Sequence, residues 1–320
     1  MTANQSDMSV DAGKKAKIVV LGGINMDLIG ITARLANPGE TVIGDNFYTA
    51  PGGKGGNQAV AAARMGGRVS MIGRVGTDIF GPILLEELQG YGVDVTGVAI
   101  DTEHSSGIAV ILLNAERQNH IVQILGANMQ CNDEQFAATR SALEGAGVLM
   151  LQLEIPYAVS IAAAREAKRL GVTVMWDPAP ASAGFPVESF EVLDVVTPNQ
   201  TEAEALTGIA VTDLRSAQAA ADELHRMGAP TAILKLGEDG IYYSGPDGSG
   251  HVSSHDVEAV DTVAAGDAFG GAFAVALGEG RGIETAVRAG TAAGALAVTR
   301  PGAQEAMPSR DEVLHMLSSG

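Results

Sequence analysis

The 320-residue sequence predicts an α/β fold, a doubly wound, mostly parallel central sheet that is flanked by helices. Short apolar runs alternate with helical patterns along the chain, which is typical of βαβ units. The 41 glycines suit tight turns between strands and helices, and an aromatic content of 4% argues against an aromatic-rich β-sandwich. We therefore expect one large α/β domain.

The first expected strand lies in the segment Lys17 to Gly23, an apolar run that glycines end. Similar runs follow, each before a polar turn or a helical pattern, and they predict further parallel strands. These runs are Ala146 to Leu153, Val172 to Trp176, Val192 to Thr197 and Thr231 to Leu236.

Helical patterns fill the intervals between these strands, and Gly171 and Gly228 stand where a glycine commonly ends a helix. The expected helices are Gln58 to Met65, Ile79 to Tyr91, Tyr157 to Leu170, Thr201 to Leu206, Leu214 to Met227, Ala268 to Gly278 and Ile283 to Val298.

Two segments, about 28–49 and 106–125, alternate in polarity without an amphipathic helix between their strands. We expect them to pair as a small separate sheet that forms a lid. Residues 1–16 lack the apolar stretch of a signal peptide and are predicted to be a loose tail. Residues 17–320 then form the α/β domain that carries the lid.

Composition excludes several classes of protein. A net charge of −18 would repel a nucleic-acid backbone. No run of about 18 apolar residues predicts a membrane span. The single cysteine, Cys131, excludes an internal disulfide and a cysteine-built zinc site, which fits a reducing cytoplasm.

The strongest local feature is the heptapeptide Asp261 to Asp267, which precedes a helical run rich in small residues. Free N–H groups at such a helix start would stabilise the charge on a transferring phosphoryl group. Asp267 could activate an attacking hydroxyl there. The alternative is that Asp267 only caps the helix.

A second feature is the glycine-rich segment Gly52 to Gln58, just before a helical run. It lacks the G-x-x-x-x-G-K-[ST] pattern of a Walker motif. Its glycines permit close backbone approach, and Asn57 offers a donor and an acceptor suited to sugar hydroxyls. The alternative is a flexible glycine turn.

Two further segments follow apolar strands. In Thr197 to Glu202, Asn199 and Glu202 are one helical turn apart, so they could order Mg²⁺ through water or form an N-terminal capping box. The segment Lys235 to Gly240 ends a strand in a glycine turn that could run beneath a nucleotide or be an ordinary turn.

Together these segments resemble the ribokinase family, also called the PfkB sugar kinases, in order and spacing from about residue 17 to residue 308. The carriers are Gly23 to Asp27, Gly52 to Arg64, the LQLEIP stretch around Glu154, Asp177 to Ala181, Thr197 to Glu204, Asp261 to Phe269 and Ala297 to Gln304.

The resemblance implies a role for each matching residue. Asp267 would be the catalytic base, beside a phosphoryl-binding turn of Ala264, Ala265 and Gly266. Asn25, Asp27, Gly53, Lys54, Gly55, Asn57 and Glu154 would bind the sugar with Asp267. Asn199, Lys235, Gly237, Gly240, Gly266 and Thr291 would line the ATP site, with Glu202 ordering Mg²⁺ through water. Asp261, Val263, Ala297, Arg300 and Gly302 would bind a monovalent cation, K⁺.

Three residues depart from the family pattern. Ala306 stands where a serine is frequent near the cation, so one oxygen ligand is missing or supplied by water. Thr291 replaces an asparagine or histidine near the adenine. Asp177 replaces an asparagine. We expect the last two to leave phosphoryl transfer unaffected.

The implied activity is ATP-dependent phosphorylation of D-ribose at its 5-hydroxyl. The alternatives are a related kinase for fructose, deoxyribose, a keto-deoxy sugar acid or a nucleoside, or else a non-catalytic sensor of sugar or nucleotide. The family also implies a homodimer that pairs through the lid.

Overall fold

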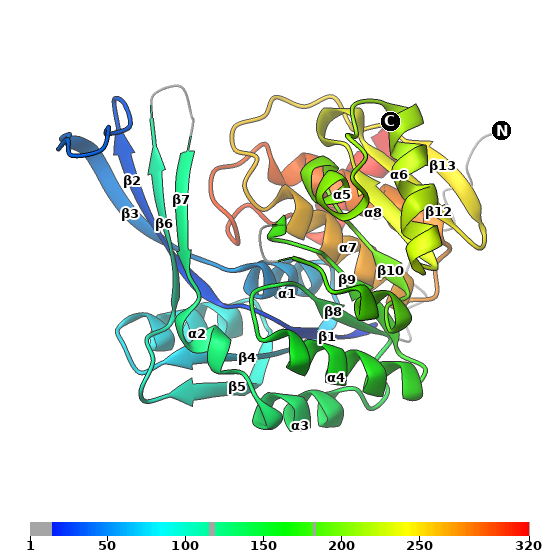
Figure 1. Cartoon of the computed structure of the whole chain (residues 1–320), viewed down its shortest axis with the longest axis horizontal. Coiled ribbons are helices and arrows are strands. Elements are labelled where there is room, and N and C mark those ends of the chain that lie inside the picture. The colour runs from blue at the N-terminus through cyan, green and yellow to red at the C-terminus, as the bar shows by residue number, and fades with distance from the viewer. Residues whose placement is uncertain (1–14, 115–118, 182–183, 320) are drawn as a thin grey trace.

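The computed structural model describes residues 15–114, 119–181 and 184–319. Within them, a large sheet lies between two layers of helices, and a smaller sheet projects from one end of this body (Figure 1). The predicted fold class is confirmed. Except for Lys15 and Ala16, the tail predicted over residues 1–16 lies outside the described residues.

The large sheet has the strand order β13-β12-β11-β10-β9-β8-β1-β4-β5 within the described ranges. Neighbours pair in parallel from β5 to β11, while β12 and β13 are antiparallel. Most strands therefore end at one edge of the sheet, where α/β proteins bind ligands. The strands are β1 (Lys17–Leu21), β4 (Arg68–Gly76), β5 (Asp94–Asp101), β8 (Val148–Leu151), β9 (Thr173–Trp176), β10 (Val195–Val196), β11 (Thr231–Lys235), β12 (Ile241–Gly245) and β13 (Gly248–Val252).

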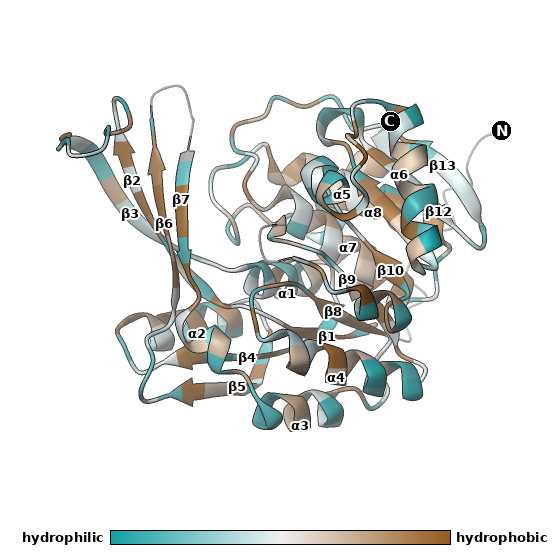
Figure 2. Ribbon diagram, viewed as in Figure 1, coloured by the Kyte–Doolittle hydropathy of each residue, from teal (hydrophilic) through white to brown (hydrophobic). Residues whose placement is uncertain are grey.

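Both faces of the large sheet are buried along its central strands, such as β1 and β8. Along β1, Ile18 and Val20 belong to one apolar cluster and Val19 and Leu21 to another, because successive side chains of a strand point to opposite faces. Figure 2 shows the resulting layers, hydrophobic strands between helices with hydrophilic outer faces. The helices are α1 (Lys54–Arg64), α2 (Phe80–Gly90), α3 (Asp133–Ala142), α4 (Tyr157–Arg169), α5 (Gln200–Thr207), α6 (Leu214–Met227), α7 (Ala265–Gly278), α8 (Ile283–Ala297) and α9 (Arg310–Ser319).

Several predicted bounds were wrong. Helix α1 begins at Lys54 instead of Gln58, and α7 begins at Ala265 instead of Ala268. Strand β10 has two residues, far fewer than the predicted 192–197. Glycine is a poor helix former, so the sequence did not indicate that the helices begin this early. Their starts depend on tertiary packing that favours glycine there.

The small sheet has the order β3-β2-β6-β7 and contains both segments that were expected to pair. Strands β2 and β6 are parallel, and the outer pairs are antiparallel. Exposed apolar side chains stand on it, among them Phe47, Ile121 and Val122. Its strands are β2 (Asn25–Thr32), β3 (Gly44–Gly52), β6 (Gly107–Leu113) and β7 (Asn119–Ile124).

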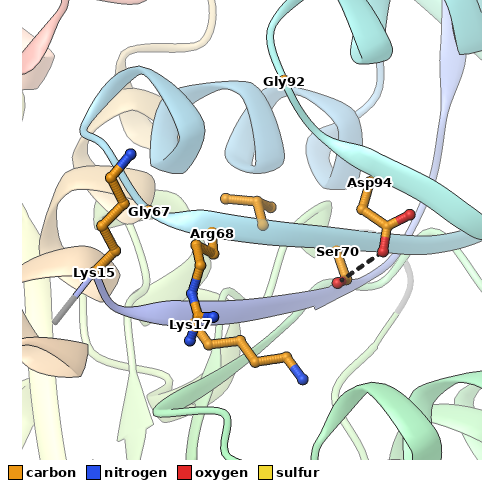
Figure 3. A pocket seen from close by; sticks show the side chains of 8 residues that line it. Lys15, Lys17, Gly67, Arg68, Ser70, Gly92 and Asp94 are labelled. Atoms are coloured by element: carbon orange, nitrogen blue, oxygen red, sulfur yellow. Dashed lines mark hydrogen bonds between the residues drawn. The ribbon is translucent and has the colours of Figure 1, made fainter.

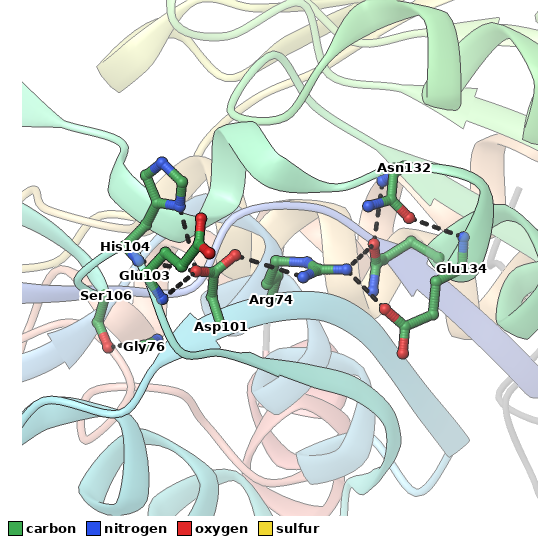
Figure 4. Close-up of polar contacts among 9 residues, drawn as sticks. Arg74, Gly76, Asp101, Glu103, His104, Ser106, Asn132 and Glu134 are labelled. Carbon is green, nitrogen blue, oxygen red and sulfur yellow. Dashed lines mark hydrogen bonds and ion pairs between the residues drawn. The ribbon is translucent and has the colours of Figure 1, made fainter.

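Charged and polar side chains fix the point where the chain enters β6 (Figure 4). Arg74 on β4 contacts Asp101 at 3.3 Å and Glu134 at 2.6 Å, which ties β4 to β5 and α3. Backbone N–H groups, that of Glu103 first, hold the pKa of Asp101 down at about 2. The carboxylate of Asp78 accepts hydrogen bonds from the Ser106 backbone and hydroxyl. The small sheet thus joins the body through an ordered connection.

A hollow of about 340 Å³ lies at the amino-terminal ends of β1, β4 and β5 (Figure 3). Lys15, Lys17, Arg68 and Asp94 line it. This hollow is at the edge of the sheet opposite the strand ends discussed below. No helix in the described ranges is both long and apolar enough to cross a membrane.

Candidate active site

A cleft of about 1000 Å³ opens at the carboxyl ends of β9, β10 and β11, against α7 and α8. Asp177 follows β9, and Lys235 ends β11. The residues expected around ATP line this cleft: Asn199, Lys235, Gly237, Gly240, Gly266 and Thr291. Lys54, Glu202, Ala264, Ala265 and Asp267 line it as well.

Asp267 lies in the first turn of α7, but it does not cap the helix. The N-cap residue is Ala264, which has a φ of 59° and makes no side-chain capping bond. Among the described residues, Ala264 alone combines a side chain with a positive φ, a strained conformation that is frequent at functional sites. The capping alternative for Asp267 is therefore wrong.

The Asp267 carboxylate is instead held by two amides from α1. Asn57 Nδ2 donates to Oδ2 and Gln58 Nε2 donates to Oδ1, both at 3.0 Å. Burial raises the pKa of Asp267, the Lys54 charge opposes that rise, and the Asp177 charge adds to it. A carboxylate fixed in this way, with a raised pKa, is suited to accept a proton.

The glycine-rich segment is a tightly packed helix start, so the alternative of a flexible turn is wrong. Gly53 is the N-cap of α1 with a φ of 83°, and a Cβ there would lie 2.6 Å from the Asn25 nitrogen. A Cβ on Gly55 would lie 2.7 Å from the Gly23 carbonyl oxygen. These contacts place the beginning of α1 directly against the loop after β1.

A buried polar network surrounds Glu154, which is 2% exposed. Its carboxylate accepts hydrogen bonds from Asn25 Nδ2 at 3.3 Å, from the Lys54 backbone N–H at 2.8 Å and from Gln123 Nε2. Asn128 Nδ2 donates to Asn25 Oδ1 at 2.7 Å. Burial raises the pKa of Glu154, and the Lys54 charge opposes that rise.

Two more residues expected in the sugar site, Asp27 and Asn57, interact with Glu154 or with Asp267. Burial, followed by the charges of Glu154 and Asp267, raises the pKa of Asp27 to about 7. The buried Oδ1 of Asn57 has no hydrogen-bond partner within the described part of the chain. A buried acceptor without a partner is costly, so a donor from a ligand would stabilise it.

Asn199 and Glu202 form the capping box of α5. Asn199 Oδ1 accepts from the Glu202 N–H, and Glu202 Oε2 accepts from the Asn199 N–H, both at 2.8 Å. Glu202 nevertheless lines the cleft, where burial raises its pKa and the Lys235 charge opposes that rise. No group of three or more His, Cys, Asp or Glu side chains in the described ranges is placed to hold a metal ion.

The residues expected around a monovalent cation come together in part. Asp261 accepts from the backbone N–H of Val263 at 3.0 Å and of Gly302 at 3.2 Å. The Arg300 N–H donates to the Ala297 carbonyl at 3.2 Å. Ala306 is fully buried.

The sequence did not predict the contacts of Gln58, Asn128 and Gln123, nor those of Asp177. Gln58 Nε2 donates to Asp177 Oδ2 at 3.1 Å as well as to Asp267. Asp177 therefore belongs to the network around the candidate base. Gln58 follows Asn57 directly, and adjacent helical residues point in different directions, so their convergence on one carboxylate could not be foreseen.

Comparisons with known proteins agree with this geometry. Residues 15–310 match the family described as pfkB family carbohydrate kinase. A ribokinase from Haemophilus influenzae is 38% identical over 94% of this chain and 98% of its own length. A deoxyribokinase from Salmonella typhi is 35% identical over 94% and 98%.

A solved structure of Arabidopsis thaliana ribokinase, complexed with ribose and ATP, is similar with a TM-score of 0.86 and 33% identity. The match covers 95% of this chain and 99% of that one. The chain therefore belongs to the pfkB family of carbohydrate kinases, and it is a phosphotransferase of the sugar kinase type.

Proposed function

We propose that this enzyme transfers the γ-phosphoryl group of ATP to the 5-hydroxyl of D-ribose, giving ribose 5-phosphate and ADP. The observation that carries the proposal is the position of Asp267. Its carboxylate accepts hydrogen bonds from the buried amides of Asn57 and Gln58, and it lines the large cleft at the start of α7. The similarity to ribokinases supports ribose as the acceptor.

In the proposed mechanism, ATP occupies the cleft with its γ-phosphate at the first turn of α7. Asp267 accepts the proton of the sugar hydroxyl while the new O–P bond forms and the bond to the β-phosphate oxygen breaks. The amides of Ala265 and Gly266 lie in the first turn of α7, where the Ala265 N–H makes only a long hydrogen bond of 3.4 Å to the Thr262 carbonyl, so they would stabilise the phosphoryl charge. General-base assistance of this kind contributes about 10²- to 10⁴-fold in rate.

The residues present fit the two implied metal ions to different degrees. Glu202 offers carboxylate oxygen at the cleft wall, which suits Mg²⁺ bound largely through water. Asp261 and nearby carbonyl groups offer oxygen ligands for K⁺, and the Ala306 side chain has no oxygen to contribute. The ions would neutralise phosphate charge when bound.

The sugar would lie between the small sheet and the start of α1. Donors and acceptors would be presented there by Asn25, Asp27, Asn57 and Glu154. The buried Oδ1 of Asn57, which has no partner among the described residues, would accept a hydrogen bond from a sugar hydroxyl. We propose that the small sheet acts as the lid of this site, because Gln123 on β7 already contacts Glu154. A covered site would exclude water as a competing acceptor.

Deoxyribose is the second candidate acceptor, favoured by the 35% identity to a deoxyribokinase. The test is ADP release with purified enzyme over ribose, deoxyribose, fructose, a keto-deoxy sugar acid and adenosine, each with and without K⁺. The highest kcat/KM for ribose supports the proposal. A clear preference for another acceptor would replace ribose in the proposal. If no acceptor stimulates ADP release, the alternative of a non-catalytic sensor of sugar or nucleotide would be favoured.

Pairing of two copies through their small sheets is a further part of the proposal. Phe47, Ile121 and Val122 are exposed on this sheet, with 64%, 54% and 61% of their surface accessible. Apolar side chains and free strand edges favour a partner surface. Val122→Lys should shift the mass measured by analytical ultracentrifugation from dimer to monomer, whereas a monomeric parent protein would contradict the pairing.

We also propose that the enzyme works in the cytoplasm.

A further inference from the structure

The ammonium group of Lys235 lies beside the start of α7. Its Nζ is 2.9 Å from Asp177 Oδ1, and its side chain is 14% exposed at the cleft wall. A Cβ built on Gly266 would lie 3.3 Å from this nitrogen. The lysine charge and the first-turn amides of α7 therefore face the same part of the cleft.

Asp177 fixes that position from the protein side. It is 3% exposed, its Oδ2 accepts from Gln58 Nε2 at 3.1 Å, and its Oδ1 accepts from Lys235. The same Gln58 nitrogen donates to Asp267 at 3.0 Å. An unbroken chain of polar contacts thus runs from Lys235 through Asp177 and Gln58 to the proposed base.

Acidic side chains line the cleft beside Lys235. Asp177, Glu202 and Asp267 line it, and the whole chain carries a net charge of −18. A polyphosphate entering such a site needs positive charge close to its oxygens. An ammonium group has three N–H donors, so its bond to Asp177 leaves it capacity to donate to phosphate.

We propose that Lys235 is a catalytic residue that binds the β- and γ-phosphates of the nucleotide, and that Asp177 is a positioning residue that holds the lysine over the start of α7. This inference rests on the proposed ATP site, and within that site it assigns the β- and γ-phosphate contacts to a lysine outside any Walker motif. It also gives a function to the aspartate that departs from the family pattern, because asparagine carries no charge to pair with Lys235.

The first test measures nucleotide binding by calorimetry without sugar, using AMP and the non-hydrolysable analogue AMP-PNP. Charge-assisted hydrogen bonds to phosphate are strong, so Lys235→Met should weaken AMP-PNP binding about 10- to 100-fold. Binding of AMP, which lacks the β- and γ-phosphates, should change less than about threefold. Lys17→Met, in the hollow at the opposite edge of the sheet, is the matched control and should change neither.

Equal weakening of AMP and AMP-PNP, or no weakening of either, overturns the role of Lys235. The measurement needs no acceptor, so a failure of ribose as substrate would not affect it. Conversely, normal AMP-PNP binding by Lys235→Met would leave the proposed sugar phosphorylation intact.

The second test asks whether Asp177 acts through the lysine. Asp177→Asn should lower kcat with little change in the KM for sugar, and Asp177→Asn combined with Lys235→Met should be no slower than Lys235→Met alone. AMP affinity serves as the measure of correct folding in every variant. Fully additive losses in the double variant would overturn the positioning role of Asp177.

Discussion

Different kinds of polar group lie on the two sides of Asp267. On the side of Glu154, the polar groups are buried side chains that bond to one another, as in the contacts of Asn25 with Glu154 and Asn128. On the cleft side, they are helix-start amides, a glycine turn and the Lys235–Asp177 pair. Directional side-chain bonds suit the discrimination of hydroxyl groups, whereas amides and cations suit a polyphosphate of spread charge.

Substitutions on the two sides of Asp267 should therefore have different effects. Changes on the Glu154 side should alter which acceptor binds and how tightly. Changes on the cleft side should alter nucleotide binding and rate. Asp267 belongs to both sides, since Asn57 and Gln58 hold it from α1 while its own helix lines the cleft.

The largest expected effect is that of Asp267→Asn. The amide cannot accept the hydroxyl proton, so kcat should fall by about 10²- to 10⁴-fold. Binding of sugar and nucleotide should remain measurable by calorimetry, because the substitution keeps the shape of the side chain. Turnover near the parent value would remove Asp267 from the mechanism.

Gly53→Ala should have the next largest effect, because it disturbs the contact between the start of α1 and Asn25. The new Cβ would collide with the Asn25 nitrogen at a φ of 83°, so we expect a loss of about 2–3 kcal/mol in the free energy of unfolding. Gly171→Ala is the control, since its φ is 72° but its Cβ would meet open space. Equal losses in urea denaturation would show that strain alone, without the contact, accounts for the glycine.

The same glycines show what sequence reasoning could and could not reach. The fold class, several of the strands and helices and the small sheet followed from periodicity and motif, whereas β4, β5, β12, β13, α3 and α9 were not predicted, and the role of Asp267 stays a prediction. The start of α1 at Lys54 did not, because helical glycines are favoured there by a contact with Gly23 from another part of the chain. Likewise, Gln58 and Asp177 acquire their meaning only when α1, β9 and α7 are brought together.

The pH dependence of sugar binding should test whether the Asp27 carboxylate binds the sugar. Asp27 has a pKa of about 7 when folded, well above its usual value. Sugar hydroxyls donate best to the ionised carboxylate, so ribose affinity should rise by about tenfold from pH 6 to pH 8.

Folding stability should change with pH in the opposite direction. Between about pH 4 and pH 7 the folded chain keeps a proton on Asp27 that the unfolded chain has released, so the free energy of unfolding should fall as pH rises through this window. Asp27→Asn should flatten both profiles in calorimetry and in urea denaturation. Profiles unchanged by that substitution would assign the dependence to another group.

The smallest expected effect separates two roles of Asn199. Asn199→Ala removes the capping bond to the Glu202 N–H, which should cost about 1 kcal/mol in the free energy of unfolding. Asp213→Ala removes the corresponding bond to the Ser216 N–H at the start of α6, on an exposed surface, and should cost a similar amount. Only the first variant should also weaken binding of AMP-PNP, because Asn199 and Glu202 line the cleft and Asp213 does not. If both variants bind the nucleotide as the parent does, Asn199 serves only to cap α5, and the cleft side of the comparison depends on α7 and Lys235.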